Sequence, residues 1–154
     1  MGNFGTDNGR TTHLTRQQLH DLSLVECLEL LSTSHLGRLA FVDSVGVLPI
    51  IIPVTYVMYD GSVVFRTGPG AKLVAAVRGA PVAFEVDGVD EADRTGWSVV
   101  VRGHAEELVD AVELTDLREQ HLRPWAPGAK RHYVRVNANL ISGRRIDVNS
   151  AAGP

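Results

Sequence analysis

Residues 63–73 have the sequence VVFRTGPGAKL, and the change of pattern inside this segment indicates how the chain is built. The first five residues have the apolar, β-branched character of a strand. Two glycines and a proline then break the strand, and Leu73, Val74 and Val77 mark one face of a short helix at residues 71–78. The segment therefore predicts a strand that ends in a turn and continues as a helix.

The same junction gathers positive charge. Unpaired N–H groups at the start of a helix favour an anion. Arg66 at the strand end and Lys72 in the first helical turn add two cations, and the Thr67 hydroxyl adds a donor. A lysine in the first turn opposes the helix dipole, so Lys72 makes more sense with a dianion beside it. The alternative is a solvated turn with two surface cations.

The order Gly-Ala-Lys-Leu at residues 70–73 lacks the Gly-Lys-Ser/Thr ending of a P-loop. A phosphate other than a nucleoside triphosphate therefore fits this junction better.

Composition limits the classes of function. The chain has 154 residues, which is about one domain, with 44% hydrophobic and 21% charged residues. Its 15 basic and 18 acidic residues argue against a general nucleic-acid binder. The single cysteine, Cys27, permits no internal disulfide and fits a reducing cytoplasm. Because neither a membrane span nor a signal peptide is found, we expect a cytoplasmic protein with no membrane partner.

Helices are predicted where capping-box patterns occur. These patterns lie at residues 15–18, 23–26 and 110–113. Cys27 lies on the apolar face of the second helix, which indicates a core residue rather than a nucleophile. We expect residues 1–13 to be disordered, residues 14–148 to form a single domain, and residues 149–154 to be a tail.

Strands account for most of the remaining chain. Asp60-Gly61 is a two-residue hairpin signal. Pro53, inside a long apolar strand expected to be buried on both faces, implies an edge position or a bulge. We expect an acidic loop at residues 87–96 and a turn at Ser142-Gly143. The predicted strands are residues 38–42, 48–58, 62–67, 82–86, 97–105, 130–136 and 139–148.

The strands are not alternated with helices, so a doubly wound parallel sheet is disfavoured. Six or seven strands in hairpin connection, with short peripheral helices, predict a mainly β fold. The best fit is a small antiparallel barrel, closed or split.

Several short motifs occur in an order that resembles a known family. They are HLGRLAF at residues 35–41, PVTY at 53–56, FRT at 65–67 with Lys72, GWSV at 96–99 and SGRRI at 142–146. Together they resemble the flavin-binding split-barrel family related to pyridoxamine 5′-phosphate oxidase, in particular its short actinobacterial members. The resemblance covers residues 14–148, and it rests on the order and spacing of the motifs.

The resemblance implies a homodimer that holds two molecules of flavin mononucleotide (FMN) at the subunit interface. It implies that Arg66 and Lys72 hold the phosphate. The flavin ring would lie against the backbone of residues 53–55, with Trp97 and Ser98 nearby. The residues expected at the cofactor are Pro53, Val54, Thr55, Phe65, Arg66, Thr67, Lys72, Leu73, Trp97, Ser98 and Val99.

Several functions fit this resemblance. The leading hypothesis is a flavin-dependent oxidoreductase acting on an unidentified small molecule. The alternatives are a deazaflavin-dependent reductase, a flavin- or haem-binding store, carrier or redox sensor, and a barrel that only mediates protein contacts. Haem would require one histidine, His35, His104 or His132, to face the pocket. The longer vitamin-making oxidase has a C-terminal substrate-binding segment without a match here, so pyridoxamine phosphate oxidation is not supported.

The sequence predicts no catalytic side chain and no metal site. Ser/His/Asp and Cys/His arrangements are absent, and a flavin carries its own hydride chemistry. His104-Ala-Glu106 resembles part of a deaminase signature, but the two cysteines are missing. Aromatic side chains either wall a substrate pocket or pack in the core or interface; these are Tyr56, Trp97, Trp125 and Tyr133.

Overall fold

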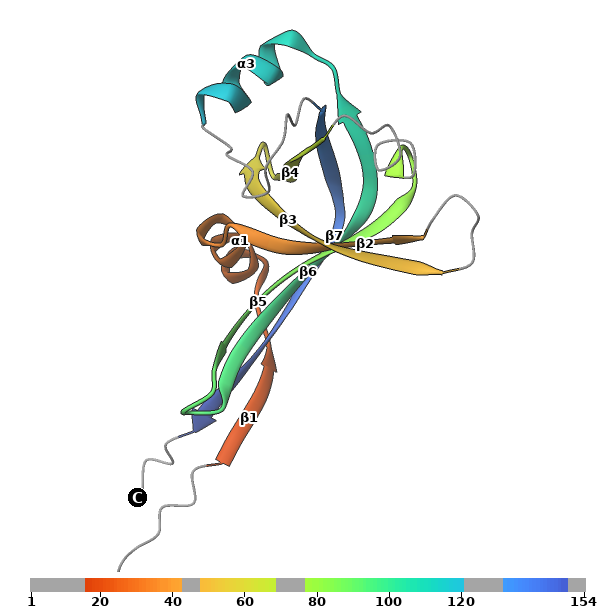
Figure 1. Cartoon of the computed structure of the whole chain (residues 1–154). Helices are drawn as coiled ribbons and strands as arrows, with labels where there is room; N and C mark the ends of the chain where they lie inside the picture. The colour runs from red at the N-terminus through yellow and green to blue at the C-terminus, as the bar shows by residue number, and fades with distance from the viewer. Residues whose placement is uncertain (1–15, 43–47, 69–76, 121–131, 150–154) are drawn as a thin grey trace, which may run out of the picture.

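The computed structural model describes residues 16–42, 48–68, 77–120 and 132–149 (Figure 1). These residues form β1 (Arg16–Asp21), α1 (Leu24–Thr33), β2 (Leu36–Val42), β3 (Pro49–Tyr59), β4 (Ser62–Thr67), β5 (Pro81–Asp90), β6 (Thr95–Leu108), α3 (Ala111–Glu119) and β7 (His132–Asn149).

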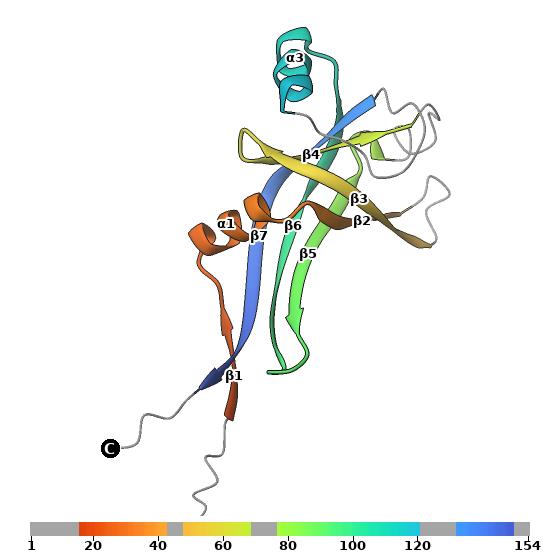
Figure 2. The ribbon, with the colours of Figure 1, turned by 60° about the vertical axis from the view of Figure 1, so that its left-hand side comes forward.

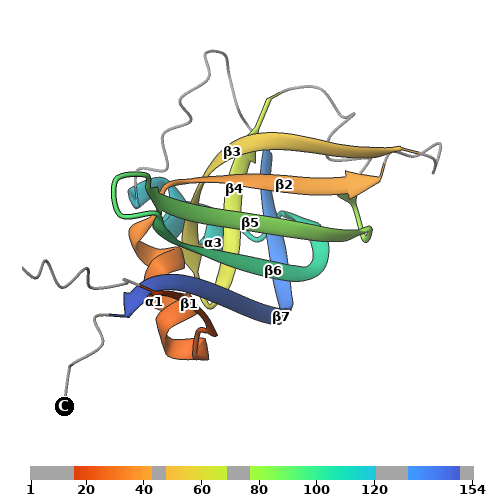
Figure 3. The ribbon, with the colours of Figure 1, turned by 90° about the horizontal axis from the view of Figure 1, so that it is seen from below.

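All strands belong to one antiparallel sheet that closes on itself. The strand order is β1-β7-β4-β3-β2-β5-β6, and β6 also pairs with β7. This second pairing closes the sheet into a barrel and leaves β1 attached outside the ring. Figure 3 shows β3, β2, β5, β6 and β7 side by side along one wall. The mainly β antiparallel barrel predicted from the sequence is confirmed.

The barrel core comes from alternate residues of each strand. Val63 and Phe65 of β4 and Phe84 of β5 are fully buried in it. The Tyr56 and Phe84 rings meet edge to face with centroids 4.7 Å apart. A Cβ on Gly37 would lie 2.2 Å from Phe84 Cζ, so glycine is required where β2 passes this ring.

Helix α1 covers one end of the barrel. Ser23 caps it as predicted: its hydroxyl accepts from the Glu26 N–H, and the Glu26 carboxylate accepts from the Ser23 N–H. Cys27 and Leu31 are buried in the core, so the prediction for Cys27 is confirmed. The Tyr56 hydroxyl donates to the Leu31 carbonyl at 2.6 Å, which ties α1 to β3.

Helix α3 packs on the outer surface of the barrel. Its predicted start is confirmed, because the Asp110 carboxylate accepts from the Val112 and Glu113 N–H groups. Leu117 packs into a second apolar cluster with Val64, Leu108 and Tyr133. Neither α1 nor α3 is long and apolar enough to cross a membrane, and no other helix of the described residues is.

The acidic loop predicted at residues 87–96 is wrong. Strands β5 and β6 continue through most of it as a hairpin that, with β7 and β1, extends away from the barrel (Figure 2). The Asp90 carboxylate accepts from the Ala92 and Asp93 N–H groups, and Arg94 takes a positive φ of 54° to turn the chain. Asp87 and Asp90 lie on exposed strand positions, and only Glu91 and Asp93 lie in the turn, a difference that composition alone does not reveal.

Two further corrections concern strands β1 and β7, which pair with each other. The helix predicted to follow residues 15–18 is wrong, because residues 16–21 form β1 and pair with β7. Leu19 is the only apolar residue in β1, so a helix there would have no face to bury. The turn at Ser142-Gly143 is also wrong, since β7 runs through both residues. A Cβ on Gly143 would lie 2.7 Å from Cys27 Sγ, so this glycine allows close approach of α1.

Other predictions lie partly or wholly outside the described residues. They concern residues 71–76 of the central helix, the N-terminal segment at residues 1–13, and residues 150–154 of the tail.

The burial of β3 on both faces is a prediction that the structure contradicts. Ile51, on its outer face, is 67% exposed, because the barrel of one chain covers only the inner face.

Candidate functional site

Strands β3 and β4 begin as a hairpin and then separate. Asp60 and Gly61 form the predicted two-residue turn, with φ values of 46° and 71°. The strands pair from Tyr59–Ser62 to Tyr56–Phe65. Beyond that point β3 pairs only with β2, and β4 pairs only with β7, among the strands that the structure describes. We call this divergence, between Thr55 and Arg66, the fork.

Backbone groups of β3 line one side of the fork. The Tyr56 N–H donates to the His35 carbonyl at 3.1 Å, so Tyr56 directs its polar groups toward β2. Because antiparallel ladders alternate, Val54 also faces β2, whereas Pro53 and Thr55 face away from it. The missing N–H of Pro53 therefore removes no bond to β2, and the predicted edge position of Pro53 is confirmed. The N–H of Thr55 and the carbonyls of Pro53 and Thr55 point toward the fork.

Side chains at the end of β4 line the other side. The Arg66 guanidinium carbon lies 5.1 Å from the centroid of the Tyr133 ring, its cross-strand neighbour on β7. Thr67, on the opposite face, is 8% exposed and pairs with His132. Phe65 is fully buried in the core, so a ligand in the fork would reach only its backbone.

A carboxylate with two basic side-chain partners lies beside this strand end. Glu107 Oε1 is 2.6 Å from His132 Nδ1, and Glu107 Oε2 accepts from an Arg78 terminal nitrogen at 2.7 Å. The bonds from His132 and then Arg78 lower the pKa of the Glu107 carboxyl. The sequence analysis missed this network. Glu107 and His132 are 25 residues apart, and only the pairing of β6 with β7 brings them together.

The remaining predicted residues divide into two groups. Lys72 and Leu73 lie outside the described residues. Trp97, Ser98 and Val99 lie on β6. Strands β2 and β5 stand between β6 and β3, so β6 is three strand spacings, about 14 Å along the sheet, from β3; the paired residues are Pro53, Arg38, Glu85 and Val100. Within one chain, these β6 residues are not brought to the fork.

The three β6 residues have different surroundings. The Trp97 indole lies against Gly88, where an added Cβ would be 2.6 Å from Trp97 Nε1. Ser98 stands between Asp87 and Arg144 in the register, and Val99 is fully buried. Ser98 and Trp97 also line a cavity of about 650 Å³ near Ile146 and Val89.

Arg38 occupies the outer surface next to Pro53. Its guanidinium donates to Asp87 at 2.6 Å and to Glu85 at 3.4 Å. Burial raises the pKa of the Glu85 carboxyl, and the charge of Asp87 raises it further, while Arg38 opposes both effects. This group links β2 to β5 on the face that Pro53 and Ile51 share.

The histidines considered as haem ligands are spread over the molecule. His35 is exposed, His104 Nδ1 lies 3.3 Å from Asn139 Oδ1, and His132 is held by Glu107. In the part of the chain that the structure describes, no group of three or more His, Cys, Asp or Glu side chains is placed to hold a metal ion.

Comparisons with known proteins agree on one family. The family model for pyridoxamine 5′-phosphate oxidase matches residues 23–145. The Mycobacterium tuberculosis protein Rv0080 is 34% identical over 146 residues, which cover 92% of this chain and 94% of that protein. The structure of the FAD-binding protein from Mycobacterium smegmatis has 39% identity and a TM-score of 0.70, and covers 82% of this chain and 98% of that chain. An FAD-binding protein from Mesorhizobium loti has 27% identity and a TM-score of 0.65, with 82% and 97% covered.

Proposed function

This chain belongs to the pyridoxamine 5′-phosphate oxidase family, and from that premise we propose that it binds a flavin at the fork and uses it as an oxidoreductase. The proposed cofactor is FMN, and the substrate is a small molecule of unidentified class. The single free cysteine, which is buried, supports a cytoplasmic location as part of the same proposal.

The separation of β3 from β4 after Tyr56–Phe65 is the observation that carries this proposal. It leaves a donor and acceptors of the β3 backbone directed away from β2, with no strand partner among the described residues. The polar edge of a flavin ring carries carbonyls and a ring N–H, which match that pattern of backbone groups. Arg66, stacked on Tyr133 at the other side of the fork, supplies a cation suited to a phosphate. The residues present therefore fit a flavin phosphate.

FMN and FAD share the ring, the ribityl chain and the first phosphate. The two structural relatives named above are described as FAD-binding proteins. The fork contacts proposed here involve only the shared portion, so they serve either cofactor. Equilibrium titration with both flavins decides between them, and tighter binding of FAD would replace FMN in this proposal.

The chemistry divides between cofactor and chain. A bound flavin supplies hydride transfer, and the protein supplies position and electrostatics. We propose that Arg66 and Lys72 hold the phosphate, and that the backbone of residues 53–55 orients the ring. The stacking of Arg66 on Tyr133 would restrict the guanidinium before the cofactor binds, which reduces the ordering cost.

We also propose that the protein is a homodimer with the cofactor at its interface. The outer face of β2 and β3 carries exposed apolar residues beside Arg38, with Ile51 67%, Val42 47% and Leu36 41% accessible. Exposed apolar patches of this kind commonly mark contact surfaces, and a symmetric pair is the commonest way to cover one. Because Trp97 and Ser98 lie three strands from the fork of their own chain, any contact with the flavin is proposed to come from the second copy.

The absorption spectrum of the purified protein tests the cofactor. Flavin, deazaflavin, haem and no cofactor give different spectra. A haem or deazaflavin spectrum contradicts the proposal, and so does a protein that shows no bound flavin even after FMN is added. Turnover is tested separately by reducing the bound flavin with nicotinamide nucleotides without oxygen and then adding candidate acceptors. Flavin that binds but is neither reduced nor reoxidised at a catalytic rate would favour a store, carrier or sensor.

A further inference from the structure

His132 lies beside the end of β4 but has no role in the function proposed so far. It is the first residue of β7 and stands directly opposite Thr67, the last residue of β4. Opposed residues of an antiparallel pair have Cα atoms roughly 4.5–5.5 Å apart and project from the same face. A ligand that reaches the Thr67 side chain therefore lies next to the His132 ring.

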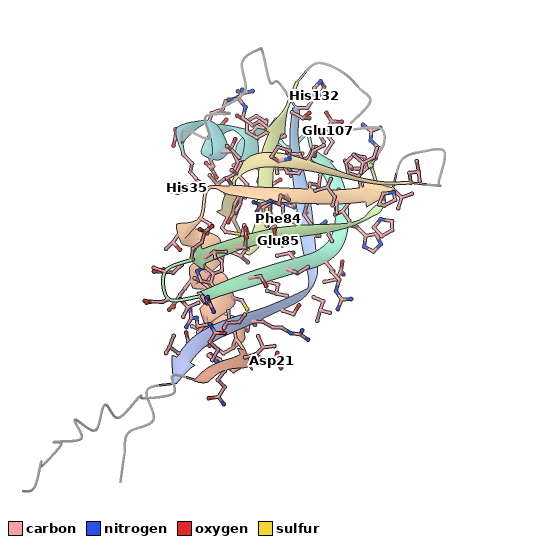
Figure 4. All side chains as sticks on the ribbon, turned by 60° about the horizontal axis from the view of Figure 1, so that its bottom comes forward. Asp21, His35, Phe84, Glu85, Glu107 and His132 are labelled. Carbon is pink, nitrogen blue, oxygen red and sulfur yellow. The ribbon has the colours of Figure 1, made fainter. Side chains whose placement is uncertain are left out.

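Glu107 controls the orientation of that ring. The 2.6 Å contact between Glu107 Oε1 and His132 Nδ1 fixes Nδ1 as the donor toward the carboxylate. The side chain of Glu107 is 17% exposed and that of His132 is 38% exposed, so the carboxylate is inside and the imidazole faces solvent. Figure 4 shows His132 and Glu107 adjacent where β7 and β6 approach β4. When the ring is protonated, its Nε2 is a second donor.

Glu107 has two basic partners, because Arg78 donates to its other oxygen at 2.7 Å. Arg66 lies on the other face of β4 against Tyr133, and the nearby Glu106 is directed to Arg135 on the outer surface. Arg78 and His132 are thus held together by Glu107, and both carry N–H donors that an anion at the end of β4 could use.

We propose that His132, oriented by Glu107, is a further phosphate contact of the flavin site, in addition to Arg66. This inference rests on the proposed function, because it assigns a residue to that site. Glu107 acts through His132 and is a positioning residue. The competing explanation is that Arg78, Glu107 and His132 only tie strands together, in which case their loss would affect every ligand equally.

The test compares flavins with and without a phosphate. FMN, FAD and riboflavin share the ring, and riboflavin lacks the phosphate, so it reports the ring site alone. Each is titrated by fluorescence quenching into the wild-type protein and into the His132→Ala, Glu107→Gln and His104→Ala variants. His104 is the matched control, because its Nδ1 also has a side-chain partner, Asn139, but it lies on the exposed face of β6 away from the fork.

We expect His132→Ala to weaken binding of the phosphorylated flavin by about 10- to 100-fold, the range of one charge-assisted hydrogen bond, while riboflavin changes by less than about threefold. Glu107→Gln should weaken binding of the phosphorylated flavin by a smaller factor, again with little change for riboflavin, because the His132 ring remains but its orientation is no longer fixed. His104→Ala should change neither affinity.

Two results would overturn the inference. If His132→Ala and Glu107→Gln weaken FMN or FAD and riboflavin by the same factor, or weaken neither, His132 does not contact the phosphate, although the flavin site stands. If the wild-type protein binds none of the three flavins, both the proposed function and this inference are wrong. Glu107→Gln keeps the test decisive where His132→Ala lowers the yield of folded protein.

Discussion

Tyr56 and Phe65 face each other at the last rung that β3 and β4 share. Both side chains are buried in the barrel core, so this rung is fixed from the inside. The Tyr56 hydroxyl also reaches the Leu31 carbonyl, which links the rung to α1. The point at which the two strands separate is thus set by packing and by one buried hydrogen bond.

The first prediction concerns that hydrogen bond. Tyr56→Phe leaves the Leu31 carbonyl without its donor, so we expect the free energy of unfolding at pH 7 to fall by about 1–2 kcal/mol. Urea denaturation of the two proteins measures this difference. Tyr59→Phe is the control, because the Tyr59 hydroxyl bonds the exposed Asp116 carboxylate at 3.1 Å and its loss should have a smaller effect.

The same residue predicts a pH dependence. Burial raises the pKa of Tyr56 to about 12 from its ordinary value of 10.0. Between these values the unfolded chain loses the proton first, so the stability contributed by Tyr56 is complete below pH 10 and declines as pH rises toward 12. The difference between wild-type protein and Tyr56→Phe should therefore shrink above pH 10. A difference that is constant from pH 8 to about pH 11.5 would contradict the assignment.

The third prediction tests the backbone edge of the fork. The Thr55 N–H faces away from β2, so Thr55→Pro removes a donor at the fork and no bond of the β2–β3 ladder. We expect flavin affinity to fall by about tenfold with a small change in melting temperature. Val54→Pro is the matched control. It removes an N–H that faces β2, so its main effect should be a lower melting temperature. If folded Thr55→Pro binds flavin with unchanged affinity, the flavin ring does not lie against this edge of β3.

The fourth prediction concerns the phosphate. Replacing Arg66 and Lys72 with alanine removes two charge-assisted contacts of ~1.5–3 kcal/mol each, so FMN affinity should fall by roughly two to four decades. Arg66→Lys should not restore binding, because lysine lacks the planar group that stacks on Tyr133. Isothermal titration measures both variants. A folded double variant with wild-type affinity would show that the phosphate lies elsewhere.

Local sequence signals were sufficient for several elements. Ser23 with Glu26 predicted the start of α1, Asp60-Gly61 predicted the β3–β4 turn, and both are found. Pro53 indicated an edge because a missing N–H constrains a strand wherever the strand lies. In each case the physical cause lies within a few residues of the chain.

The errors arose where distant pairing decides the structure. Residues 16–21 carry a helix-start pattern, yet their partner is the far end of β7, residues 144–149. Gly143 resembles a turn residue in sequence, but it is a glycine because Cys27 approaches it. The contact between Glu107 and His132 had no sequence signal, since neither their spacing nor their types indicate that their strands are neighbours.

The last prediction concerns the second copy. Ile51 lies on the outer face of β3, adjacent to the fork, and is 67% exposed. In a dimer that covers this face, Ile51→Asp would bury a carboxylate without a partner, which costs several kcal/mol. We expect light scattering to show dimers for the wild-type protein and monomers for Ile51→Asp. Flavin binding should weaken in parallel, because a ligand that contacts both copies is linked to their association. Val112→Asp on α3 is the control: Val112 is 70% exposed and lies outside the β2–β3 face, so this variant should remain dimeric and bind flavin. A wild-type protein that is monomeric at every concentration, yet binds one flavin per chain, would overturn both the dimer and the interfacial site.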